Sequence, residues 1–318
     1  MDRLDSLDAY RGIAIALMLF FTLIQILSNN LPEVLRHNVA GMFHFGDFVL
    51  TMFVFASGMS VVFFIEKRKE NLTGLVLDSM ERFAKLFIVG ILLSLFSTGE
   101  WFGMDPIMLM GLLFLISLPL YFIPEYLLVI ISMAIYGFYF FIGYETMSNV
   151  MYGSYLGGYY ALPFYLPVFL AGIWLGKRCL NNDGLKESAI LTSIAIVLGS
   201  IAYVFIPIDK VVATPSFMIL AIGISSAVFM MCQYMYLKFR MRIGFLEYLG
   251  MKPLRFWIMM FVFLLLPHDF CILLSGCPVN FGFEWTTAIG IEMILFLFFI
   301  GVSKVIDKLK LEVKDENR

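Results

Sequence analysis

The fold is decided by the stretch from His37 to Ile65, which reads HNVAGMFHFGDFVLTMFVFASGMSVVFFI. Two of the three histidines, His37 and His44, and one acid, Asp47, stand before and at the start of a run that is otherwise apolar. Such a run is long enough to cross a bilayer as a helix. Because ionisable groups at the mouth of a membrane helix are costly to hold there, these three side chains are candidates for function.

The composition of the whole chain agrees with a membrane protein. Its 318 residues are 61% hydrophobic and only 14% charged, with a mean hydropathy of +0.91, whereas soluble domains are nearer one-quarter charged. Apolar runs recur along the whole length, so we expect an all-α polytopic bundle in one domain, residues 1–318. A net charge of −2 without a basic block argues against nucleic acid as a partner. The four cysteines lack zinc-binding spacing, so no metal is expected.

Ten apolar runs are candidate membrane spans. They are Tyr10–Asn29, Asp47–Ile65, Phe83–Ser97, Ile107–Ile123, Tyr126–Ile142, Leu162–Leu175, Ala189–Ile206, Thr214–Tyr236, Gly250–Leu266 and Trp285–Ile306. If the N-terminus is cytoplasmic, all but two of the 22 lysines and arginines fall on the cytoplasmic side, and only Arg36 and Lys210 fall outside. The positive-inside rule therefore predicts that both termini are cytoplasmic. The histidines His37, His44 and His268 then lie at the external face of the cell membrane.

The N-terminal motif Ser6-Leu-Asp-Ala-Tyr-Arg-Gly12 opens the first span. Asp8 and Arg11 are three residues apart and share a helix face, where they can pair. Alternatively, Asp8 caps the helix while Arg11 reaches the headgroups. The motif resembles the opening signature of the heparan-α-glucosaminide N-acetyltransferase family. Members are multi-span membrane enzymes that carry an acetyl group from cytosolic acetyl-CoA to a sugar amine on the far side.

The resemblance continues in register along the chain. His37 stands ten residues before Asp47, and Gly58 stands eleven after it, which is similar to the family's second-span pattern. Arg82 stands eight residues before Gly90, as the family's arginine does. Two later stretches, Leu162 to Gly176 and Leu249 to Leu254, are similar to a Pro-rich helix ending in Gly-x-x-x-Gly and to a late Gly-x-Asn-Pro-Leu element.

Three polar positions of the family pattern differ in this chain. Thr22 and Lys252 stand where the family has asparagine, and Met108 stands where it has glutamine. Those side chains would contact donor or acceptor, so their replacement affects the expected substrate more than the expected fold. The Gly172-x-x-x-Gly176 pair predicts close helix packing.

The stretch from His37 to Asp47 suits acyl transfer. An amine or hydroxyl loses a proton as it attacks a thioester, and neutral imidazole is the usual base near pH 7. A nearby carboxylate orients the imidazole and stabilises its charged form. The resemblance implies that His37 is the catalytic base or a transient acyl carrier, whereas spacing favours His44 as the neighbour of Asp47. The alternative is that both histidines lie in an interfacial loop and Asp47 only caps a helix.

The densest cationic cluster comprises the loop Glu66-Lys-Arg-Lys-Glu70 together with Arg82 and Lys85. One interpretation is that these charges set the topology and bind anionic lipid. The other is that they bind the phosphates of acetyl-CoA, for which arginine is well suited. Arg82 is the strongest candidate because it enters a span, where a charge needs a reason. Lys85, Arg11 and Lys252 are further candidates.

Two classes of function fit these features. The first is an acyl-CoA-dependent N- or O-acetyltransferase that acts across the membrane on an amine or hydroxyl of a sugar or glycan. The second is a transporter or flippase; an inactive acyltransferase-like scaffold is a third reading. The registered distance from His37 to Asp47, opposite a cationic cytoplasmic end, favours the acyltransferase. Its expected partners are acyl-CoA, a sugar acceptor and the bilayer. The sequence leaves the oligomeric state open and is compatible with a homodimer.

Overall fold

The computed structural model describes residues 4–28, 30–36, 44–98, 105–151, 161–265 and 281–316. Within these ranges the chain forms helices and no strand. The elements are α1 (Asp5–Leu27), η1 (Glu33–Leu35), η2 (Phe45–Asp47), α2 (Phe48–Glu66), α3 (Leu72–Thr98), α4 (Pro106–Phe122), α5 (Glu125–Ile142), α6 (Tyr144–Met151), α7 (Ala161–Leu180), α8 (Gly184–Phe205), α9 (Pro215–Lys238), α10 (Gly244–Met251), α11 (Pro253–Met260), η4 (Phe261–Leu265) and α13 (Trp285–Glu316).

All ten predicted spans coincide with helical segments in the described residues, which confirms the all-α class there. In the described part of the chain, six helices are long and apolar enough to cross a membrane by length and composition: α1, η2 with α2, α5, α8, α9 and α13. Both α4 and the segment from Pro253 to Phe263 are apolar but shorter. The count of ten spans therefore stays a prediction.

The ninth span differs from its prediction. Instead of one helix from Gly250, α10 ends at Met251, Lys252 leaves the helical conformation, and α11 begins at Pro253. Proline has no backbone N–H and disfavours helical geometry in the residue before it, but it fits the first position of a helix. The same proline therefore ends one helix and starts the next. Further along, the helix loosens into the π-helical turn η4.

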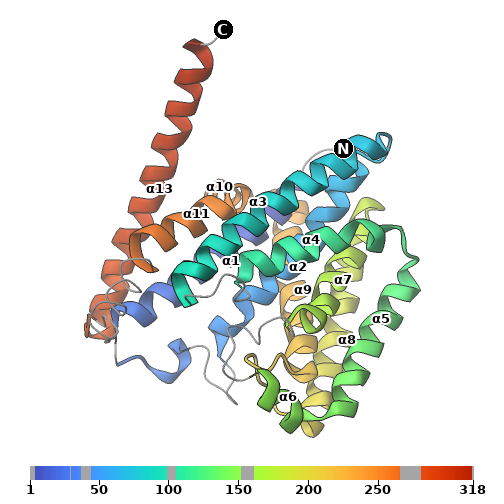
Figure 1. The fold of residues 1–318 in the computed structure, drawn as a ribbon. Helices are drawn as coiled ribbons and strands as arrows, with labels where there is room; N and C mark the ends of the chain where they lie inside the picture. Colours follow the sequence, from blue (N-terminus) through green and yellow to red (C-terminus); the bar gives the residue numbers. More distant parts are fainter. Residues whose placement is uncertain are drawn as a thin grey trace.

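The helices pack in neighbouring pairs, with α8 along α9, α2 along α7, α1 along α10 and α3 along α4 (Figure 1). Because it also contacts α1, α4 and α9, α2 is central. In its most apolar window 72% of the residues are buried, against 11% for α5, which lies at the side of the bundle. At the other extreme, α13 extends beyond the other helices toward the C-terminus (Figure 1).

Glycines bring α2 and α7 into backbone contact. A Cβ atom on Gly58 would lie 2.2 Å from the carbonyl oxygen of Phe169, and one on Gly172 would lie 2.2 Å from that of Phe55. Gly176 also faces α2, so the predicted role of the Gly172–Gly176 pair in close packing is confirmed. This close crossing fixes the position of α2 relative to α7, and thereby the position of Asp47 at the start of α2.

Candidate functional site

Polar contacts gather at two opposite ends of the bundle. At one end, Asp47 precedes α2, and the loop between α8 and α9 lies over it through Lys210. At the other end, where α2 finishes, the Tyr121 hydroxyl of α4 donates to Glu66, and Arg178 of α7 pairs with Glu125 of α5. We call these the Asp47 end and the Arg82 end, after the predicted site residue at each.

The two carboxylate oxygens of Asp47 face different groups. Oδ2 accepts a hydrogen bond of 3.1 Å from the His44 backbone N–H and lies 3.7 Å from His44 Nδ1. Oδ1 lies 3.6 Å from Lys210 Nζ. The side chains of Asp47 and His44 are only 1% and 4% exposed, and that of Lys210 is 10% exposed. A carboxylate this deeply buried is tolerable only when it is paired, and the lysine supplies the opposite charge.

The loop between α8 and α9 directs Lys210 toward Asp47. Its neighbour Asp209 is fully buried and accepts hydrogen bonds from the backbone N–H groups of Val211 and Val212 and from the Tyr144 hydroxyl of α6. Asp209 is thus engaged in holding the loop, and Lys210 reaches into the bundle. Burial lowers the pKa of the Lys210 amine, and the nearby carboxylate of Asp47 opposes that shift.

The His44 ring faces Asp47 through its Nδ1 atom. Its Nδ1 is buried and has no hydrogen-bond partner among the described residues. The gap of 3.7 Å to Asp47 Oδ2 is longer than a hydrogen bond, but such contacts in ligand-free sites often tighten when substrate binds. Spacing had favoured His44 as the neighbour of Asp47, and the structure places the two in contact range. His37 and His268 lie outside the described residues.

At the Arg82 end, two guanidinium groups share one aromatic ring. The guanidinium carbon of Arg82 lies 4.0 Å from the centroid of the Phe64 ring, and that of Arg68 lies 4.4 Å from it. Arg68 also donates to Asp78 at 2.8 Å. Arg82 has no carboxylate within 4.0 Å in the described part of the chain. Its planar fork is therefore open to an incoming anion such as a phosphate.

The other three candidates for phosphate binding are already paired. Lys85, which is largely exposed, pairs with Glu81 on the same helix. Arg11 pairs with Asp8, so the pairing alternative holds over a purely capping role for that aspartate. Lys252 pairs with Asp307 of α13, which also accepts from Arg255 at 2.7 Å.

These candidates fall in two places. Arg82 and Lys85 belong to α3, whereas Arg11 and Lys252 belong to the crossing of α1 and α10. At that crossing a Cβ atom on Gly250 would lie 1.8 Å from the Asp8 carbonyl oxygen. Arg82 and Arg68, which share the Phe64 ring, form one candidate phosphate site, whereas Arg11 pairs within α1 and Lys252 joins the end of α10 to α13.

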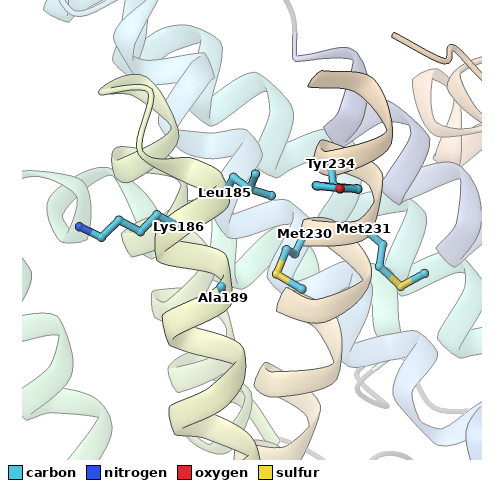
Figure 2. A pocket seen from close by; sticks show the side chains of 6 residues that line it. All are labelled: Leu185, Lys186, Ala189, Met230, Met231 and Tyr234. Carbon is cyan, nitrogen blue, oxygen red and sulfur yellow. The ribbon is translucent and has the colours of Figure 1, made fainter. Parts of the chain in front are cut away.

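A groove of about 420 Å³ lies elsewhere, between α8 and α9 (Figure 2). It is lined by Leu185, Lys186, Ala189, Met230, Met231 and Tyr234. In Figure 2 the Lys186 side chain extends away from the facing helix, so the wall between the helices is apolar. None of the predicted site residues lines the groove.

The family model described as heparan-alpha-glucosaminide N-acetyltransferase, catalytic, matches residues 3–202, which is well over half of the chain. The chain belongs to this family. No curated protein matches it.

Membership in the heparan-alpha-glucosaminide N-acetyltransferase family makes this a membrane acetyltransferase by descent, in a family that uses acetyl-CoA. The matched residues include His44, Asp47 and Arg82, and Lys210 lies beyond them. Among the described residues, no group of three or more histidines, cysteines and acids is close enough together to hold a metal ion.

The sequence did not point to Lys210 as a site residue, and it included Arg68 only as part of the cationic cluster. Lys210 carried one signal, because it is one of only two basic residues on the predicted external side. Arg68 was one of several charges in a loop, and its sharing of the Phe64 ring with Arg82 depends on how α3 turns back beside α2.

Proposed function

We propose that the protein is a transmembrane acyltransferase. It would move an acetyl or other acyl group from cytosolic acyl-CoA to an amine or hydroxyl of a sugar at the extracytoplasmic face of the cell membrane. The observation that carries the proposal is the family match over residues 3–202. In support of it, the matched region includes an imidazole facing a buried carboxylate, the arrangement that base-assisted acyl transfer requires.

The two ends have different tasks in this proposal. At the Arg82 end, Arg82 and Arg68 bind the phosphates of acyl-CoA, with Lys85 on the same helix as a more exposed contact. At the Asp47 end, an imidazole removes the proton of the acceptor amine or hydroxyl as it attacks the acyl carbonyl, and Asp47 stabilises the resulting imidazolium. His37, by resemblance, is the base or acyl carrier, and His44 is the imidazole beside Asp47.

Label transfer from radiolabelled acetyl-CoA tests the proposal. The purified protein is incubated with glucosamine or a panel of glycans, and the wild type is compared with His37→Ala, His44→Ala and Asp47→Asn. We expect His37→Ala to reduce transfer by roughly 10²- to 10⁴-fold, the usual contribution of a general base. A larger loss in His44→Ala than in His37→Ala would assign the base to His44 instead.

Binding of acetyl-CoA tests the role proposed for the Arg82 end. Arg82→Gln should weaken CoA binding, whereas Lys186→Gln, an exposed cation at the groove of Figure 2, should leave it unchanged. If the wild type neither binds CoA nor transfers label to any acceptor, the acyltransferase is excluded, and a transporter or flippase becomes the better reading of the buried charges.

A further inference from the structure

Lys210 stands out because it is a buried cation that nothing in the proposed reaction yet uses. All but two of the chain's lysines and arginines fall on the predicted cytoplasmic side, whereas this one is nine-tenths buried beside Asp47. The two residues that follow Lys210 in the loop, Val211 and Val212, are apolar and offer its ammonium group no polar side chain. A lysine pays a desolvation cost in such a place unless an anion offsets it.

We propose that Lys210 is a positioning residue of the acyl-transfer site, which holds Asp47 ionised beside the His44 imidazole. The inference rests on the proposed function for its catalytic meaning, but the ion pair itself can be tested without any transfer. Its geometric basis is that Lys210 Nζ lies 3.6 Å from Asp47 Oδ1, while Asp47 Oδ2 lies toward His44.

Groups from several elements face Asp47, and Lys210 supplies a counter-charge. On its own segment, Asp47 faces His44, and on α2 the Thr51 hydroxyl donates to the Phe48 carbonyl at 2.7 Å. From α7, the buried Tyr165 lies within electrostatic reach of Asp47, but its hydroxyl is neutral. From the loop between α8 and α9 comes Lys210.

The contacts of the loop between α8 and α9 give a reason why Lys210 pairs with Asp47 rather than with its neighbour Asp209. Asp209 would be its simplest partner along the chain, yet its carboxylate accepts from the backbone N–H of Val211 at 2.8 Å and from the Tyr144 hydroxyl at 3.0 Å. The Asp209 backbone N–H, in turn, donates to Thr214 Oγ1 at 3.0 Å. These contacts make the loop a fixed support, so that Lys210 meets Asp47 from a set direction.

The pH profile of transfer distinguishes a positioning role from a structural one. Removal of a neighbouring cation disfavours the charged form of a carboxylate, so Lys210→Met should lose roughly 10²-fold in transfer near pH 7 and recover as the pH is raised. Lys210→Arg keeps the charge and should keep the wild-type profile. Asp47→Asn should show no recovery, and adding Lys210→Met to it should cost little more, because both changes remove the same interaction.

Infrared spectroscopy tests the ion pair independently of activity. A protonated-carboxyl band should appear near neutral pH in Lys210→Met, be absent from the wild type and Lys210→Arg, and vanish when Asp47→Asn is added. If that band appears while the wild type transfers no label, the ion pair stands and the proposed function fails. An unchanged spectrum and an unshifted pH profile in Lys210→Met overturn the inference.

The yield of folded protein provides a third test of the inference. Should Lys210→Met fail to fold, the double variant with Asp47→Asn, which buries no uncompensated charge, is expected to recover folded yield. A double variant that folds no better than the single one overturns the inference.

Discussion

Asp105 illustrates how a single buried carboxyl shapes stability. It caps α4 by accepting the Ile107 backbone N–H at 2.8 Å, and it is only 2% exposed. Burial raises its pKa from the ordinary 3.8 to about 7, and the hydrogen bond offsets only part of that shift. Between these values the folded protein binds the proton more tightly than the unfolded chain, so stability should fall as the pH rises from about 4 to 7.

The variant Asp105→Asn isolates this effect because asparagine caps helices about as well as aspartate does. Three pKa units correspond to about 4 kcal/mol, which is the ceiling for the pH-dependent loss. We expect the unfolding temperature of Asp105→Asn in detergent to vary less between pH 5 and 8 than that of the wild type, and to be higher at pH 8. Parallel curves for the two proteins would contradict this account.

At the same scale, the sequence was informative about His44 and Asp47 but not about Lys210. His44 is the extended residue before the short 3₁₀ turn η2, which ends at Asp47, so local geometry alone brings these two together. Lys210 lies far along the chain and reaches Asp47 only because α8 and α9 return their connecting loop to the start of α2. Contacts of that kind depend on packing, which hydrophobic periodicity does not encode.

At the scale of elements, the crossing of α2 and α7 makes a sharp prediction. In Gly172→Ala the added methyl would meet the Phe55 carbonyl oxygen, and backbone cannot move aside as a side chain can. Forcing the helices apart should cost about 1–3 kcal/mol or more, and it would shift Asp47 as well. Gly137→Ala on α5 is the matched control, because a Cβ atom there meets nothing within 4 Å. A lower unfolding temperature for Gly172→Ala alone is expected; equal values for the two variants would refute it.

Helix limits were predictable where the signal was local. Each of the ten predicted apolar runs coincides with helix in the described residues, and the Gly172–Gly176 pair marked a close contact. The ninth span was placed wrongly across Lys252, because its apolar content hid the break that Pro253 imposes. Within the predicted external loop after α5, the short helix α6 was missed, since its amphipathic turn carries tyrosine and glutamate rather than a membrane run.

At the scale of the whole molecule, the orientation in the membrane decides whether the reaction must cross it. The structure places Glu145 of α6 at the Asp47 end and Lys69, after α2, at the Arg82 end, and both side chains are exposed. Since nearly all lysines and arginines fall on the predicted cytoplasmic side, and Lys67, Arg68 and Lys69 follow α2 at the Arg82 end, that end should face the cytoplasm. In a background without the four native cysteines, Glu145→Cys should react with an impermeant thiol reagent in intact cells, and Lys69→Cys only after permeabilisation. The reverse pattern would put the imidazole and the acyl-CoA phosphates on the wrong sides for the proposed transfer. Labelling of both cysteines in intact cells would mean that the two ends do not lie on opposite sides of the membrane, and the acyl group would then have no bilayer to cross.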